Sequence, residues 1–379
     1  MSYLAYSVKY VPTGLSKLLH LNWPLVVVIC AVASAGFLML YSVAGGDLSV
    51  WAEPQMKRFG FGLVIMFAMA FVPIWYWRNL AGMAYLLAFI LLIVVEFFGS
   101  EGKGAQRWLD LGFVRLQPSE LMKVALVMLI AAYYDWLDVK KISHPLYVLV
   151  PVLLILLPAA LVLIQPNLGT TLLLVASGAS VMFAAGVSLW YFAGVGVLTG
   201  GAIFGVFTTR GSAWQFLHDY QYARIDTFLN PMTDPLGAGY NINQAQIALG
   251  SGGWSGRGFM QGTQSRLNFL PEKHTDFIFT TLAEEFGFVG AFSLLVLYGL
   301  IIFFCFTSAL QNRDRFASLV SIGVGATFFF YLAVNLSMVM GLAPVVGVPL
   351  PLLSYGGSAM LVIMVAFGLT QSAHVHRPR

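Results

Sequence analysis

The chain alternates between long apolar runs and short polar connections. The runs are each about 18 residues or longer, which is enough to cross the hydrocarbon core of a bilayer as an α-helix. They cover residues 22–43, 58–76, 80–98, 118–135, 146–164, 168–186, 189–208, 276–308, 316–340 and 352–374. The pattern predicts an all-α polytopic membrane protein with about ten transmembrane helices.

One connection, residues 209–275, is far longer than the others. Loops of this length in compact proteins are usually functional or disordered, and its many aromatic side chains disfavour disorder. Residues 243–249 predict a short helix within it, and a cluster of glycines, which adopt positive φ at low cost, follows at 250–258. We expect a single membrane domain, residues 1–379, in which 209–275 is a large extracytoplasmic loop between the seventh and eighth spans.

The composition supports the membrane assignment, because 59% of the residues are hydrophobic and 9% are charged. An average soluble domain has about 25% charged residues. The net charge is only +4 and the basic residues are scattered, so nothing indicates a nucleic-acid partner.

Lysine and arginine are more frequent on the face that holds both termini. That face has nine: Lys9, Lys17, Arg78, Lys140, Lys141, Arg313, Arg315, Arg377 and Arg379. The short loops of the opposite face have five: Lys57, Arg58, Lys103, Arg107 and Arg115. Because cytoplasmic loops carry the excess of positive charge, both termini are predicted to be cytoplasmic.

Charged side chains gather just before the eighth span, at Glu272, Lys273, His274 and Asp276. Asp276 is the strongest candidate for chemistry, because an ionisable group where the chain enters hydrocarbon is a functional candidate by default. The alternative is structural: Thr275 caps the helix, and Asp276 in the first turn is stabilised by the helix dipole. Position alone favours neither interpretation.

Two opposite charges, Glu120 and Lys123, lie three residues apart in the fourth span and can pair on one helix face. They form either a buried structural pair or an anion contact in a central cavity. The adjacent residues Glu284 and Glu285 in the eighth span fit a structural role better than a catalytic one. Trp108, after Arg107 in the loop 99–117, could contact a lipid-borne substrate, although interfacial tryptophan is common.

The segment 342–358 holds three prolines and three glycines, and it includes Ser354. It predicts irregular backbone that lines a cavity, because such backbone is tolerated in a membrane only where protein or water covers it.

Five segments together resemble the SEDS family of polytopic cell-wall proteins, and the likeness covers nearly the whole chain. They are Gly104-Ala-Gln-Arg-Trp108, Gln117-Pro-Ser-Glu-Leu-Met-Lys123, Gln165-Pro-Asn-Leu-Gly-Thr170, residues 262–279 and residues 344–358. The Gly-Thr-Gln-Ser and Phe-Leu-Pro-Glu-Lys-His stretches resemble the elongation branch of the family more than its division branch. One departure is Asn167, where the family usually has aspartate, which questions any role there that needs a negative charge, such as cation binding.

The resemblance implies a peptidoglycan glycosyltransferase that polymerises lipid II on the outer face of the cytoplasmic (inner) membrane during cell elongation. Asp276 matches the essential aspartate of the family, and we expect it to act as the general base in an inverting transfer. The diphosphate leaving group would be neutralised by cations among Lys123, Arg210, Arg257, Arg266 and Lys273. Further substrate contacts are expected from Glu120, Trp108, Arg107, His274, Glu272 and Ser354. No metal ligands are predicted, although a divalent cation, Mg²⁺ or Mn²⁺, could share the neutralisation.

The resemblance also implies a class B penicillin-binding protein as the transpeptidase partner, together with other proteins of the elongation complex. Two other functions are considered: a lipid II flippase and a non-catalytic scaffold of that complex. The polar residues concentrate at the outer surface and form no continuous track across the bilayer, which favours the enzyme over the flippase.

Overall fold

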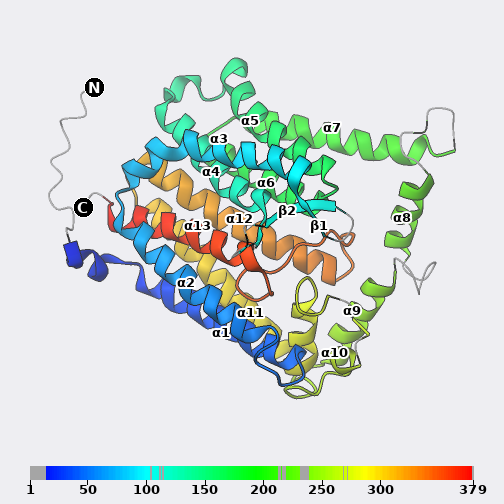
Figure 1. The fold of residues 1–379 in the computed structure, drawn as a ribbon. Helices are drawn as coiled ribbons and strands as arrows, with labels where there is room; N and C mark the ends of the chain where they lie inside the picture. The colour runs from blue at the N-terminus through cyan, green and yellow to red at the C-terminus, as the bar shows by residue number, and fades with distance from the viewer. Residues whose placement is uncertain are drawn as a thin grey trace.

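The computed structural model describes residues 14–102, 105–110, 112, 115–211, 215, 219–230, 239–267, 269–270 and 272–377. Within these ranges a long helix corresponds to each of the ten predicted spans, and the helices form one bundle (Figure 1). They are α1 (Trp23–Val43), α2 (Ala52–Phe71), α3 (Ile74–Phe98), α4 (Pro118–Trp136), α5 (Pro145–Ile164), α6 (Leu168–Ala185), α7 (Leu189–Thr208), α11 (Ile278–Leu310), α12 (Arg315–Val339) and α13 (Gly357–Val375).

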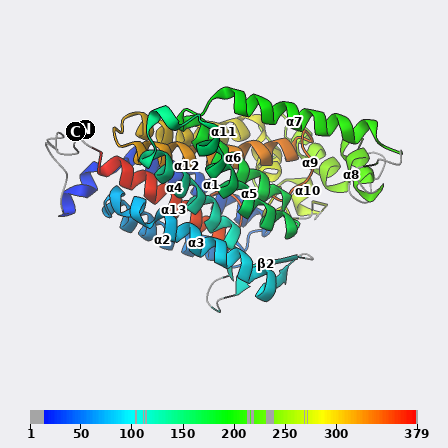
Figure 2. The same ribbon diagram turned by 90° about the horizontal axis from the view of Figure 1, so that it is seen from above.

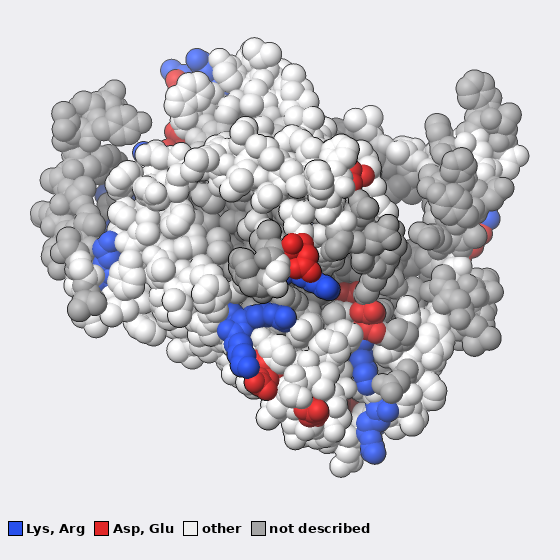
Figure 3. All heavy atoms as spheres, viewed as in Figure 1, with Lys and Arg blue, Asp and Glu red and all other residues white. Residues whose placement is uncertain are grey.

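Eight of these helices are long and apolar enough to cross a membrane. The other two, α2 and α4, contain charged residues, among them Lys57 and Arg58 in α2 and the predicted pair Glu120 and Lys123 in α4. On the face drawn in Figure 3, most charged side chains gather at the lower centre of the view, a few lie at its edges, and broad areas are uncharged. The protein is therefore a multi-pass helical membrane protein.

Both described ends of the chain, the 3-10 helix η2 (Gly14–His20) and the end of α13, lie at the same end of the bundle (Figure 1). We call this the terminal end. The opposite, loop end carries a small antiparallel sheet of β1 (Ser100–Gly102), β2 (Ala105–Asp110) and β3 (Arg115–Leu116), seen beside the bundle in Figure 2. It also carries the short helices α8 (Asp219–Leu229), α9 (Tyr240–Ser251) and α10 (Thr263–Arg266). Helix α9 confirms the helix predicted at 243–249.

Three predicted spans have the wrong bounds. The second was expected at 58–76 and the third at 80–98, but α2 ends at Phe71 and α3 begins at Ile74. The break falls at Val72 and Pro73 because proline disfavours the helical conformation of the residue before it, and Val72 has an extended ψ of 130°. The tenth span was expected from 352, but the irregular segment continues to Gly356.

Helices α13 and α12 form the centre of the bundle, and α13 packs against α2, α4 and α12. Helix α7 has no buried residue, and it extends away from the other helices towards α8 (Figure 1). Because α7 contributes little to the core, the position of the site depends on the remaining helices.

Helix α11 is interrupted at Gly287, which has φ 67° and ψ −162°. The glycine cluster 250–258 lies against this interruption and replaces the missing helical hydrogen bonds. The N–H groups of Arg257 and Gly258 donate to the carbonyls of Glu284 and Glu285 at 2.9 and 3.0 Å. In return, the N–H of Phe288 donates to the carbonyl of Gly253 at 2.8 Å. The backbone N–H and carbonyl groups that the break leaves unpaired thus bind to neighbouring protein backbone, as they must where water is absent.

We expect Gly256→Ala to destabilise the fold strongly. Gly256 has φ 80°, and a Cβ there would lie 2.1 Å from the carbonyl oxygen of Glu285. The loss in free energy of unfolding should be about 2 kcal/mol or more, since both strain and steric overlap contribute. Thermal unfolding in detergent measures it. The matched control is Gly250→Ala, which meets no atom within 4 Å, and equal unfolding temperatures for the two variants would contradict this account.

Candidate functional site

Asp276 lies in a turn, residues 272–277, that precedes α11. The helix begins at Ile278 and its N-cap residue, Phe277, makes no side-chain cap hydrogen bond. The expectation that Thr275 caps the helix with Asp276 in its first turn is therefore wrong. The Thr275 hydroxyl instead donates to Glu272 Oε2 at 3.0 Å.

The backbone of this turn is held by groups from distant parts of the chain. Asn335 Nδ2 of α12 donates to the carbonyl of Asp276 at 2.8 Å. The Ser354 hydroxyl donates to the carbonyl of Thr275 at 2.7 Å, and the Tyr355 N–H donates to the carbonyl of His274 at 2.9 Å. The position of Asp276 is therefore set by tertiary contacts and not by a helix.

The irregular segment 341–356 faces the turn. Gly347 adopts φ 68°, and a Cβ at this residue would lie 3.6 Å from Asp276 Oδ2. Ser354 also accepts a hydrogen bond from the N–H of Leu350 at 2.8 Å, and its carbonyl accepts one from Gln55 Nε2 at 3.1 Å. Part of the segment lines a cavity, which confirms the prediction made from its prolines and glycines.

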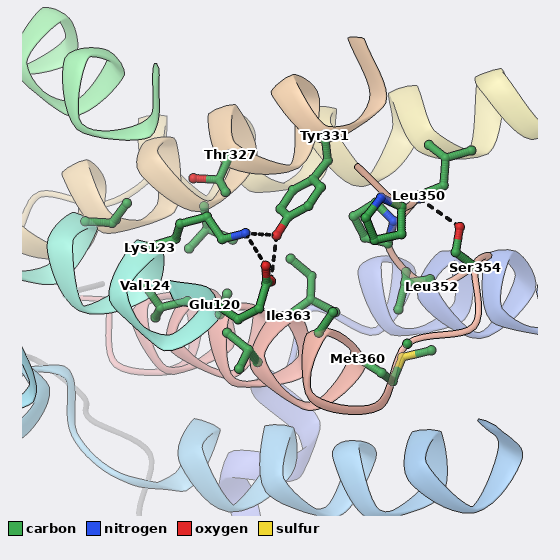
Figure 4. Close-up of a pocket in the computed structure, with 18 of the residues that line it drawn as sticks. Glu120, Lys123, Val124, Thr327, Tyr331, Leu350, Leu352, Ser354, Met360 and Ile363 are labelled. Carbon is green, nitrogen blue, oxygen red and sulfur yellow. Dashed lines mark hydrogen bonds and ion pairs between the residues drawn. The ribbon is translucent and has the colours of Figure 1, made fainter. Parts of the chain in front are cut away.

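The predicted pair of Glu120 and Lys123 is present and buried. Lys123 Nζ lies 2.6 Å from Glu120 Oε1, and the two side chains are 2% and 9% exposed. Tyr331 of α12 completes the group, because its hydroxyl donates to Glu120 Oε2 at 2.7 Å and contacts Lys123 Nζ. Figure 4 shows the three side chains pointing toward one another at one side of the cavity.

This cavity lies between α2, α4, α12, α13 and the irregular segment, and it connects the buried pair to Ser354 (Figure 4). Its volume is 30 Å³, which suits a water molecule or two and not a sugar. Because Ser354 also donates to the residue before Asp276, the cavity joins the Glu120–Lys123 pair to the turn.

An aromatic cluster covers the turn. Trp51 stacks on the His274 ring with centroids 4.2 Å apart and an interplanar angle of 12°. Tyr355 meets Trp51 edge-on at 4.7 Å, and Arg58 Cζ lies 4.9 Å from the Tyr355 ring centroid. The sequence analysis named His274 but missed Trp51, Arg58 and Tyr355, because tryptophan, tyrosine and arginine near a membrane surface are common for structural reasons.

Of the predicted cations, Lys273 lies in the turn itself. Its Nζ donates to the Ser265 carbonyl at 2.6 Å, and burial lowers the pKa of its ammonium group. Arg257, which precedes α10, and Arg266, the last residue of α10, are both exposed. Arg257 Nη1 donates to the Thr263 hydroxyl at 3.2 Å.

The other predicted contacts lie elsewhere. Arg210 forms a bidentate pair with Asp226 at 2.8 and 2.6 Å beside α8. Arg107, next to Trp108 in β2, donates to the carbonyls of Gln165 and Pro166 at 2.9 and 2.6 Å. Arg107 and Arg210 are thus engaged with groups of this chain, and their substrate roles stay predictions.

Both glutamates of α11 hold neighbouring segments. Glu284 Oε1 accepts hydrogen bonds from the N–H groups of Thr263 and Gln264 at 2.8 and 3.1 Å. Glu285 Oε1 accepts one from the hydroxyl of Ser42 in α1. Both contacts agree with the structural role expected for these residues.

Asn167 caps α6, because its side chain accepts a hydrogen bond from the Thr170 N–H at 3.3 Å. A neutral amide is sufficient for this role. Among the described residues, no group of three or more histidine, cysteine, aspartate or glutamate side chains could hold a metal ion.

Comparisons with known proteins find a matching family and similar proteins that agree with one another. Residues 17–379 match the family FTSW_RODA_SPOVE, described as "Cell cycle protein". The chain is 43% identical over 361 residues to peptidoglycan glycosyltransferase MrdB of Escherichia coli K12, covering 94% of each protein. It is 34% identical to MrdB of Helicobacter pylori, covering 91% of this chain and 88% of the relative.

Two solved structures share the fold. One comes from work on the structural coordination of polymerization and crosslinking by a peptidoglycan synthase complex; its TM-score is 0.79 at 31% identity, over 93% of this chain and 97% of the other. The second is the rod shape determining protein RodA of Thermus thermophilus, with a TM-score of 0.70 at 28% identity, over 95% and 98% of the two chains.

We expect Lys123→Met to lower the free energy of unfolding by about 3–5 kcal/mol, because it leaves Glu120 buried without its counter-charge. The double variant Glu120→Gln/Lys123→Met should regain most of this loss, since it removes both charges. Thermal unfolding of the three proteins in detergent is the measurement. An unchanged unfolding temperature for Lys123→Met would show that the buried pair does not stabilise the fold.

Proposed function

The chain belongs to the FtsW/RodA/SpoVE family, as a RodA-like elongation member, and we propose that it is a peptidoglycan glycosyltransferase that polymerises lipid II. The observation that carries the mechanism is the carboxylate of Asp276, in a turn held by hydrogen bonds from Asn335, Ser354 and Tyr355. A carboxylate on rigid backbone at the membrane surface meets the main requirement for a general base, which is position.

In the proposed reaction, a sugar hydroxyl of one lipid-linked chain attacks the anomeric carbon of another. The new bond joins that oxygen to the anomeric carbon, and the bond from this carbon to the diphosphate oxygen breaks. Asp276 takes the proton of the attacking hydroxyl. Attack opposite the leaving group inverts the anomeric carbon, and the polyprenyl diphosphate leaves as an anion.

The leaving diphosphate needs positive charge. Lys273 is the best placed cation, because it shares the turn with Asp276 and is partly desolvated. Arg257 and Arg266 are exposed and are proposed to approach a bound diphosphate. Lys123 lines the same cavity as Ser354, but it is paired with Glu120 and the cavity admits only water, so any effect of its charge on the diphosphate would be indirect. Arg210 is a weaker candidate, because Asp226 already neutralises it.

A divalent cation, Mg²⁺ or Mn²⁺, could be brought by the substrate diphosphate, although Asn167 supplies no negative charge for it.

We place the protein in the cytoplasmic membrane, with the terminal end inside and the loop end outside. The excess of lysine and arginine at the terminal end supports this orientation. A class B penicillin-binding protein is the proposed partner, and the similarity to a chain of a peptidoglycan synthase complex supports it. Other elongation-complex proteins are expected to bind as well.

A lipid II flippase and a non-catalytic scaffold are the alternatives. A flippase would move lipid II across vesicles without making polymer, and a scaffold would tolerate loss of the Asp276 carboxylate. The buried charges favour the enzyme, because Lys123, Glu284 and Glu285 are each held by hydrogen bonds to groups of this chain.

We expect Asp276→Asn to reduce lipid II polymerisation at least 100-fold, because the amide keeps the shape of the side chain but cannot accept the proton. The assay follows polymer and released polyprenyl diphosphate, using purified protein with its partner inactivated for transpeptidation. The matched control is Asp47→Asn, an exposed aspartate of the loop end whose Oδ1 accepts hydrogen bonds from the N–H and the hydroxyl of Ser49.

The outcomes of this assay separate the functions. Polymer from the wild type and Asp47→Asn but not from Asp276→Asn supports the proposal. Equal polymer from all three proteins would move the base elsewhere. Lipid II transport without polymer from the folded wild type in complex with its partner would support the flippase.

We also expect the double variant Glu120→Gln/Lys123→Met to polymerise lipid II at least tenfold more slowly than the wild type. It keeps the packing of the cavity but removes the buried positive charge below Ser354. The same polymerisation assay measures it, with an unfolding curve to show that the protein is folded. Wild-type activity in this variant would assign the pair a structural role only.

A further inference from the structure

We propose that Asn335 is a positioning residue for the reaction, which sets the place of the Asp276 carboxylate relative to the Glu120–Lys123 pair. The proposal rests on the proposed function, since it concerns the same base. Asn335 touches the backbone of Asp276 and not a reacting atom, so it acts through Asp276.

The side chain of Asn335 joins two non-helical segments. Its residue is 0% exposed, and both hydrogens of Nδ2 are used: one bond goes to the carbonyl of Asp276 at 2.8 Å and the other to the carbonyl of Val348 at 2.7 Å. Val348 follows Gly347, the residue that faces Asp276 Oδ2. One amide group thus fixes the carboxylate-bearing turn against the backbone that the carboxylate faces.

The opposite atom of the same amide supports a positioning role. Asn335 Oδ1 is buried and has no hydrogen-bond partner among the residues that the structure describes. A buried acceptor without a partner is unfavourable. A side chain selected for stability alone would have a partner for this oxygen or would lack the oxygen. A side chain that must donate two hydrogen bonds from one nitrogen is an amide, and an amide always includes the oxygen.

Helix α12 extends this link to the buried charges. Tyr331 lies four residues before Asn335 and therefore on the same helix face. Its hydroxyl donates to Glu120 Oε2 at 2.7 Å and contacts Lys123. One face of α12 therefore contacts the backbone of Asp276 through Asn335 and the Glu120–Lys123 ion pair through Tyr331. The separation of these two contacts is set by the rise of the helix.

The chemical consequence is geometric. A general base must lie within hydrogen-bond distance of the attacking hydroxyl, and a displacement of about 1 Å can lower the rate on the order of 100-fold. Loss of the Asn335 amide frees the turn on the α12 side and leaves Ser354 and Tyr355 to hold it from the other side.

The test compares Asn335→Leu, which keeps the size but has no donor, with Asn335→Ser, which keeps one donor. We expect kcat for lipid II polymerisation to fall about 100-fold in Asn335→Leu and about tenfold in Asn335→Ser, with KM within about twofold of the wild type. The matched control is Asn312→Leu. Asn312 Nδ2 also donates to a backbone carbonyl, that of Ala373 at 2.7 Å, but it lies at the terminal end.

A double-variant cycle distinguishes positioning from general support of the fold. In Asp276→Glu the carboxylate is already displaced by one methylene, so adding Asn335→Ser should lower kcat by less than the tenfold seen in the wild-type background. A merely structural residue would lower kcat by the same factor in both backgrounds. If Asn335→Leu does not fold, the cycle is complete with Asn335→Ser alone.

Equal factors in the two backgrounds, or unchanged kcat in a folded Asn335→Ser, would overturn the proposal. A failure of the proposed function is a different result, because then wild type and Asp276→Asn would already give the same amount of polymer before Asn335 is changed.

Discussion

The structure depends on one constraint, which is that backbone groups within a membrane must find hydrogen-bond partners in the protein. Regular helices meet it by themselves, but irregular backbone does not, and three irregular parts of the described chain form the site near the loop end: the interruption of α11 at Gly287, the turn 272–277 and the segment 341–356. The first is satisfied by the glycine cluster 250–258. The other two are joined to each other by hydrogen bonds from Ser354 and Tyr355, and a carbonyl of each accepts a hydrogen bond from the amide of Asn335. The site is formed where these irregular segments meet.

The same constraint governs charge. Burying an unpaired charge is costly, so Lys123 is held by Glu120 and Tyr331, and Glu284 by N–H groups of the loop. Two of these contacts also join different elements: the N–H groups that bind Glu284, and the Tyr331 hydroxyl that binds Glu120. Glu284 connects α11 to α10, and the Glu120–Lys123 pair connects α4 to α12. The groups that satisfy buried charge therefore also fix how these elements pack, and fixed packing is what a reaction that depends on position requires.

The placement of the site suits a substrate with a lipid tail and a polar head. Asp276, Lys273 and the aromatic cluster of Trp51, His274 and Tyr355 lie at the loop end. There the head group of the proposed substrate would remain in water while its tail would lie among the helices. In the bundle between the two ends, the buried charges described above are paired or hydrogen-bonded within the protein. A reaction at the membrane surface, on substrates whose lipid tails stay in the membrane, is consistent with this division between the loop end and the bundle.

The sequence by itself determined the helical membrane fold, the pairing of Glu120 with Lys123 and the irregular segment at 342–358, because apolar length, helical spacing and proline content are local properties. It also singled out Asp276, because a carboxylate at the edge of an apolar run is conspicuous. Asn335 and Tyr331 left only a weak signal, as polar side chains within an apolar span. Their partners are about 60 and 210 residues away, and the break at Gly287 is filled by a loop that local pattern does not pair with it. Only the tertiary structure decided these contacts, because a hydrogen bond between distant segments depends on how the helices pack and not on the spacing of residues along the chain.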